Sequence, residues 1–127
     1  MNIAIYENEY DTLEIAFKYL NKKFYNNTLN FQIYPRSNSL QNLLDLRNFK
    51  LIIVDLDLSS NSTLDGFGLI RDIESTVGTD LNILIFTGQE LDKNFEHHYG
   101  LSRKYPVLEK PVNYKKLHSK FIELGIF

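Results

Sequence analysis

Six residues with reactive or metal-binding side chains lie within three residues of the ends of short apolar runs: Glu7, Asn8, Asp55, Asp57, Thr87 and Lys110. A carboxylate such as that of Asp55 can attack phosphorus and hold the phosphoryl group as an acyl phosphate. The group in transfer is negatively charged, so a lysine, a hydroxyl donor and a divalent cation beside it stabilise the reaction. The residue types therefore predict phosphoryl transfer onto Asp55, with Thr87 and Lys110 contacting the phosphoryl group, provided that the fold brings them together.

The apolar runs have the length and the polar boundaries of buried strands, and they lie at 3–6, 31–34, 51–54, 83–86 and 107–108. Between them, apolar residues recur at helical spacing, which predicts helices at 13–24, 40–46, 67–77, 91–99 and 114–124. Asp65 is placed to cap the third of these helices.

Strands that alternate with helices predict an α/β fold of (βα)₅ type, a parallel sheet with helices on both faces. The length of 127 residues predicts one domain spanning 1–127. Ligands of such sheets bind beyond the carboxyl ends of the strands. The six residues named above follow those ends, so we expect them to meet at one edge of the sheet.

Charge and composition exclude several classes of protein. The 14 Lys and Arg residues are scattered against 16 acids, for a net charge of −2, which argues against nucleic acid or anionic lipid as a partner. The absence of cysteine excludes disulfides and thiol chemistry and fits a reducing compartment. We find neither an apolar run of membrane-spanning length nor a signal-peptide pattern at the start, so we expect a cytoplasmic protein without a membrane partner.

The chain resembles the receiver domains of two-component response regulators, the CheY-like family, over essentially its whole length. The segments that carry the resemblance are, in chain order, IAIYENE, LIIVDLDL, DGFGLIRDI, ILIFTG and LEKP. The resemblance implies a flavodoxin-like parallel sheet of strand order 2-1-3-4-5. It also implies that Asp55 is the phosphoacceptor, that Thr87 is the family's hydroxyl residue and that Lys110 is the lysine of the family's Lys-Pro pair.

Further properties follow from the same resemblance. Mg²⁺ is implied as the cofactor, bound by Glu7, Asn8, Asp55 and the backbone carbonyl of Asp57. A histidine kinase or a phosphotransfer protein is implied as phosphodonor. An output protein is expected on the face built from the helix at 91–99, the strand at 107–108 and the helix at 114–124. Apart from accepting the phosphoryl group on itself, the chain is not expected to be an enzyme.

Departures from the family pattern raise an alternative, a pseudo-receiver that binds partners without being phosphorylated. Asn8 stands where the family has a second acid, so Mg²⁺ is expected to bind weakly, although Asn8 could instead cap the following helix. The segment between Asp55 and Asp65 is longer than usual. Val107 replaces the family's switching aromatic residue, and Tyr105 is the nearest aromatic side chain before it.

A hydrolase of the haloacid-dehalogenase type is a further, less favoured alternative. That family also has Asp-x-Asp after a strand, followed by Thr or Ser and then Lys. Here, however, about fifty residues precede Asp55, the only acid after Lys110 is Glu123, and no room remains for a cap domain.

Overall fold

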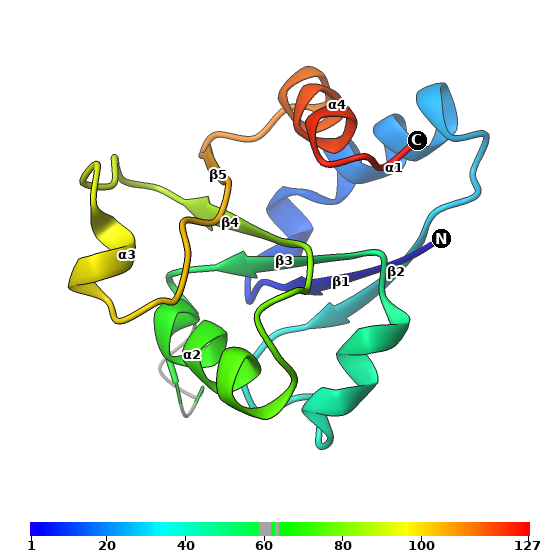
Figure 1. Ribbon diagram of the computed structural model, residues 1–127. Coiled ribbons are helices and arrows are strands. Elements are labelled where there is room, and N and C mark those ends of the chain that lie inside the picture. The colour runs from blue at the N-terminus through cyan, green and yellow to red at the C-terminus, as the bar shows by residue number, and fades with distance from the viewer. Residues whose placement is uncertain (59–61, 63) are drawn as a thin grey trace.

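The chain forms a five-stranded parallel sheet in the order β2-β1-β3-β4-β5 (Figure 1), described by a computed structural model for residues 1–58, 62 and 64–127. The strands are β1 (Asn2–Tyr6), β2 (Asn30–Tyr34), β3 (Leu51–Asp55), β4 (Ile83–Thr87) and β5 (Val107–Glu109). All four strand pairings are parallel. The predicted strands, their order and the α/β fold class are confirmed.

Helices cover both faces of the sheet, as predicted. One face carries α1 (Glu14–Phe24) and α4 (Tyr114–Glu123), and the other carries α2 (Gly66–Thr76), as Figure 1 shows. Side chains alternate between the faces along each strand. Ile3 and Ile5 therefore pack against α1 and α4, whereas Ala4 and Tyr6 pack against α2.

Two predicted helices are shorter than expected. The pattern at 40–46 forms a 3-10 helix, η2 (Leu43–Asn48), after Asn42, whose side chain accepts a hydrogen bond from the Leu44 N–H. The pattern at 91–99 forms only the four-residue helix α3 (Phe95–His98). Residues 91–94 are not helical, so the weak helical pattern forms a helix only in its second half.

The long segment after Asp55 is only partly defined, since residues 59–61 and 63 lie outside the described part. At its end, the Asp65 carboxylate accepts a hydrogen bond of 2.7 Å from the Gly68 N–H, which confirms the predicted cap of α2. Across the described residues, no helix has the length and apolar character needed to span a membrane.

Candidate functional site

The strand register aligns the predicted site residues along the carboxyl edge of the sheet. Tyr6 pairs with Val54, so Glu7 follows level with Asp55. Thr87 is the last residue of β4, one position beyond the partner of Asp55. Lys110 follows β5, and its N–H donates a hydrogen bond of 2.8 Å to the Thr87 carbonyl. Parallel pairing therefore brings four side chains together from distant parts of the chain.

Asp55 is a buried carboxylate at the end of β3, with only 2% of its surface exposed. Its Oδ1 accepts a hydrogen bond of 3.2 Å from the Asp57 N–H. Its Oδ2 accepts a hydrogen bond of 3.2 Å from Lys110 Nζ. A buried charge needs such partners, and both oxygens of Asp55 have one.

Glu7 is a second buried carboxylate beside Asp55, with 1% exposure. Its Oε1 accepts a hydrogen bond of 3.1 Å from the Glu9 N–H. Its Oε2 lies 3.1 Å from Lys110 Nζ, but the angle is outside hydrogen-bond geometry, so we regard this as a contact between charges. Burial, and then the neighbouring Asp55 carboxyl, raise the pKa of Glu7 to about 7, against a smaller opposing effect of Lys110.

Lys110 is the cation between these two acids. Burial by itself lowers the pKa of its ammonium group, but the close contact with the Glu7 carboxyl and the negative charges of Asp55 and Glu7 together outweigh burial, so the pKa is raised. One lysine therefore faces two carboxylates, which leaves the cluster short of positive charge whenever both acids are ionised.

The Thr87 hydroxyl is present at the site but is bonded to its own loop. Thr87 is 4% exposed, and its Oγ1 accepts a hydrogen bond of 3.1 Å from the Gln89 N–H. The same oxygen donates one of 3.1 Å to the Gln89 carbonyl. To donate to a group on Asp55, the hydroxyl must give up its bond to the Gln89 carbonyl.

The two remaining predicted residues are at the surface. Asp57 and Asn8 are exposed. Within the described residues Asn8 takes part in no hydrogen bond or ion pair. The residue that precedes the short helix η1 (Tyr10–Thr12) is Glu9, and α1 begins after Leu13, both without a side-chain capping bond. The alternative role of Asn8 as a helix cap is therefore wrong.

The donor set can be tested against a hard divalent cation. Glu7 Oε2 is buried without a hydrogen bond, and it lies in a pair of acids whose repulsion a cation relieves. Two carboxylates, an amide oxygen and a backbone carbonyl are oxygen ligands of the kind that Mg²⁺ takes. The described residues contain no group of three or more His, Cys, Asp or Glu side chains that could hold a metal. The set fits Mg²⁺, but with only two charged ligands.

Tyr105, the aromatic residue before β5, is bonded to α2. Its ring is 2% exposed in the core on the α2 side, and its hydroxyl donates a hydrogen bond of 2.5 Å to Glu74 on α2. Burial, and then this bond and the charge of Glu74, raise the pKa of Tyr105 to about 12. The hydroxyls of Thr87 and Tyr105 thus have separate partners, Gln89 and Glu74.

Structural comparison identifies the fold. The receiver domain protein (CheY-like) of Methanospirillum hungatei superposes with a TM-score of 0.69 at 20% identity, covering 98% of this chain and 93% of its own. The signal receiver domain of a DNA binding response regulator from Colwellia psychrerythraea gives a TM-score of 0.72 at 21% identity, covering 98% of both chains. The chain has the receiver fold.

A third receiver, the BeF3-activated N-terminal receiver domain of Klebsiella pneumoniae RstA, gives a TM-score of 0.71 at 18% identity, covering 97% of each chain. By contrast, no protein-family model and no curated protein matches this chain. These three solved structures, which share the receiver fold, are 18–21% identical to this chain.

Two residues that support the site escaped the sequence analysis. Gly66 begins α2 directly against β3, and a Cβ atom there would lie 2.5 Å from the Asp55 carbonyl oxygen. Gln89 holds the Thr87 hydroxyl through its backbone. The Asp-Gly pair at 65–66 was a usable signal for Gly66. The role of Gln89 could not be predicted from its residue type, because only its backbone groups bond to Thr87.

Proposed function

We propose that this chain is a response-regulator receiver that accepts a phosphoryl group on Asp55. The observation that carries the proposal is the buried Asp55 carboxylate at the end of β3, with Lys110 Nζ 3.2 Å from its Oδ2. A carboxylate held in this way is desolvated and fixed in direction. It is also paired with the Lys110 ammonium group, which can pair instead with an incoming phosphoryl group.

The chemistry is a displacement at phosphorus. An Asp55 oxygen forms the new P–O bond while the bond from phosphorus to the donor breaks, and the leaving group keeps its electron pair. Lys110 pairs with a phosphoryl oxygen, and Thr87 donates to another after its hydroxyl turns from the Gln89 carbonyl. Mg²⁺, when bound by Glu7, Asp55, the Asp57 carbonyl and Asn8, would neutralise the negative charge that accumulates on the phosphoryl oxygens.

We propose a histidine kinase or phosphotransfer protein as the phosphodonor. We further propose that an output protein binds the face formed by α3, β5 and α4, and that the protein works in the cytoplasm. The net charge of −2 supports protein partners over nucleic acid or a membrane. The chain would act on no substrate beyond its own phosphorylation.

Labelling with a small phosphodonor tests the proposal. The protein is incubated with acetyl phosphate and Mg²⁺, and its intact mass is followed. We expect a single phosphoryl adduct that Asp55→Asn abolishes. Asp57→Asn is the matched control, since it removes a neighbouring exposed acid and should leave labelling in place. An adduct that persists in Asp55→Asn contradicts the assignment.

Asn8 supports a second candidate function, the phosphorylation-independent pseudo-receiver. An exposed, neutral side chain at this position removes a charged ligand, while Lys110 already contacts both buried acids. In that case the folded protein takes no label even at high Mg²⁺. The haloacid-dehalogenase alternative loses its support, because Asp55 lies on the third strand of a receiver fold. Turnover of p-nitrophenyl phosphate would revive it.

A further inference from the structure

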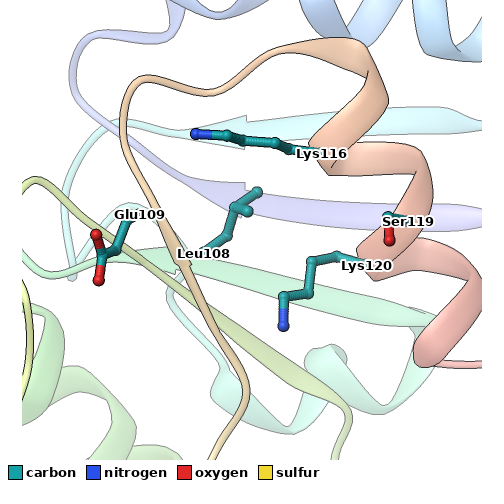
Figure 2. A pocket seen from close by; sticks show the side chains of 5 residues that line it. All are labelled: Leu108, Glu109, Lys116, Ser119 and Lys120. Atoms are coloured by element: carbon teal, nitrogen blue, oxygen red, sulfur yellow. The ribbon is translucent and has the colours of Figure 1, made fainter.

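A small groove lies between the edge strand β5 and the last helix. It is lined by Leu108 and Glu109 of β5 and by Lys116, Ser119 and Lys120 of α4. Figure 2 shows Leu108 between the two elements, with the lysine side chains extending from α4 and the Glu109 carboxylate directed away from them. The groove is therefore apolar at its floor, where Leu108 is 6% exposed, and basic along the helix side.

The charge of α4 is opposite to that of the whole protein. Its ten residues contain Lys115, Lys116 and Lys120 against Glu123, a net of +3 − 1 = +2, whereas the chain as a whole carries −2. Lys116 and Lys120 are one helical turn apart, so they lie on the same side of α4 and both line the groove. Lys115 is exposed and is not part of the lining.

The strand side of the groove offers backbone groups. The Ile85 N–H donates to the Pro106 carbonyl, and the Lys110 N–H donates to the Thr87 carbonyl. The backbone N–H and C=O groups of the even-numbered residues in this segment therefore point toward β4. In a parallel strand the intervening residues, Val107 and Glu109, direct their N–H and C=O groups to the other side. Because β5 is an edge strand, that side meets no further strand among the residues that the structure describes.

Each lysine has only a weak partner at present. Lys120 Nζ lies 3.2 Å from an oxygen of Glu123, whose side chain is 59% exposed. Lys116 Nζ donates a hydrogen bond of 3.2 Å to the Pro111 carbonyl near the surface. Exposed pairs of this kind contribute little to stability, so an incoming carboxylate can replace them at small expense of free energy.

We propose that the β5–α4 groove binds an acidic segment of the output protein, with an apolar side chain over Leu108 and carboxylates on Lys116 and Lys120. This inference rests on the proposed function, because the groove is part of the face to which we assign output. It adds the chemistry of the partner, an apolar residue flanked by Asp or Glu. Charge complementarity carries the choice, since carboxylates attract both lysines, whereas a neutral segment gains no such attraction and a basic segment is repelled.

The test uses two fluorescent pools of nine-residue peptides with a central Leu, one flanked by Asp and Glu and the other by Lys and Arg. We expect only the acidic pool to raise fluorescence anisotropy, with binding that weakens as salt is added. Lys116→Glu and Lys120→Glu should each weaken binding, and the double variant should weaken it at least roughly tenfold. Glu123→Gln should strengthen binding a few-fold, because it frees Lys120.

Lys115→Glu is the matched control, since it makes the same charge change on the same helix outside the groove. An equal loss of peptide affinity in all three lysine variants would mean that only the overall charge of α4 attracts the peptide, and it would overturn the proposal. Binding of both pools, or of neither, would also overturn it. A second copy of the chain as occupant would appear as a dimer in sedimentation that Lys116→Glu disrupts, and it would also overturn the proposal.

Failure of the groove and failure of the phosphorylation proposal are distinguishable. The acidic pool is titrated with and without beryllofluoride and Mg²⁺. Binding that is present but insensitive to beryllofluoride keeps the groove and counts against signalling from Asp55. Labelling of Asp55 by acetyl phosphate without peptide binding in either state keeps the receiver function and rejects the groove.

Discussion

In the proposed magnesium site, Asn8 is the ligand position that lacks a negative charge. It is exposed and takes part in no hydrogen bond or ion pair within the described chain, so replacing it with an acid breaks no existing bond. Asn8→Asp adds a third carboxylate to the pair. A charge-assisted contact contributes on the order of 1–3 kcal/mol, so we expect Mg²⁺ to bind roughly tenfold to a hundredfold more tightly.

Calorimetry measures this affinity directly, and the rate of Asp55 labelling by acetyl phosphate should rise in parallel at low Mg²⁺. Asn8→Ala should weaken Mg²⁺ binding modestly, because it removes a neutral oxygen ligand, and should leave the melting temperature unchanged, because the side chain caps no helix. Unchanged Mg²⁺ affinity in Asn8→Asp would mean that position 8 does not reach the metal.

Two buried tyrosines differ in whether their hydroxyls are bonded. Tyr6 is 0% exposed, and its hydroxyl has no partner among the described residues, whereas the Tyr105 hydroxyl donates to Glu74. An unsatisfied buried polar group opposes folding. We therefore expect Tyr6→Phe to raise the free energy of unfolding by about 1 kcal/mol and Tyr105→Phe to lower it by about 1 kcal/mol.

Urea denaturation of the two variants checks this pair. Both substitutions remove one oxygen from a buried ring, so the change in volume is matched and the sign alone is informative. A loss of stability in Tyr6→Phe equal to that in Tyr105→Phe would show that the Tyr6 hydroxyl has a partner in the folded protein.

At the scale of elements, the start of α2 fixes the site against the sheet. The Gly66 N–H donates to the Leu56 carbonyl at 3.2 Å, and a Cβ on Gly66 would lie 2.6 Å from Leu56 Cα. Neither backbone can yield without moving Asp55. We expect Gly66→Ala to lower the free energy of unfolding by roughly 1–3 kcal/mol and to slow Asp55 labelling.

Gly88→Ala provides the control for stability, because a Cβ at Gly88 has no neighbour within 4 Å. Thermal unfolding of both variants is the measurement. If Gly66→Ala unfolds at the temperature of the parent, then α2 is free to shift and does not hold the β3 end in place.

A second element-scale feature is the attachment of the 99–105 segment to α2. Glu74 accepts hydrogen bonds from the Ser102 N–H and hydroxyl and from Tyr105, and Arg71 donates to the Tyr99 carbonyl at 2.6 Å. The rings of Tyr99 and Phe67 stack at 3.8 Å. The connection between β4 and β5 is therefore joined to α2, which begins beside Asp55.

At the scale of the whole molecule, Glu7 links stability to pH. The folded protein keeps the Glu7 proton up to about pH 7, whereas the ordinary value for an unfolded glutamate is 4.5. Between these values the folded state binds more protons than the unfolded state, so stability decreases as pH rises. We expect the free energy of unfolding, measured without divalent cations, to fall from about pH 4.5 to about pH 7.

Glu7→Gln should flatten this dependence, because the amide does not titrate. The exposed Glu9→Gln serves as the control and should keep the parent profile. Denaturant unfolding at several pH values gives the comparison. If the free energy of unfolding instead rises with pH through this window, and by the same amount in the parent and both variants, then Glu7 is ionised throughout.

The sequence by itself determined the strands, the parallel sheet and the edge where the site lies. Apolar runs report burial, and their alternation with helical patterns leaves parallel pairing as the consistent arrangement. Asp55, Thr87 and Lys110 follow strands, so the topology alone predicts that they meet. The cap of α2 at Asp65 is equally local, since it depends on residues three positions apart.

Only the tertiary structure decided which partners these side chains have. Lys110 contacts both Glu7 and Asp55, Tyr105 bonds to Glu74 across 31 residues, and Asn8 is left in solvent rather than at a helix cap. Periodicity records which side of an element is buried, and it contains no information on which distant side chain fills a hydrogen bond. The short α3 was not predictable either, because the local pattern at 91–99 only weakly favours a helix, and residues 91–94 do not form one in the folded chain.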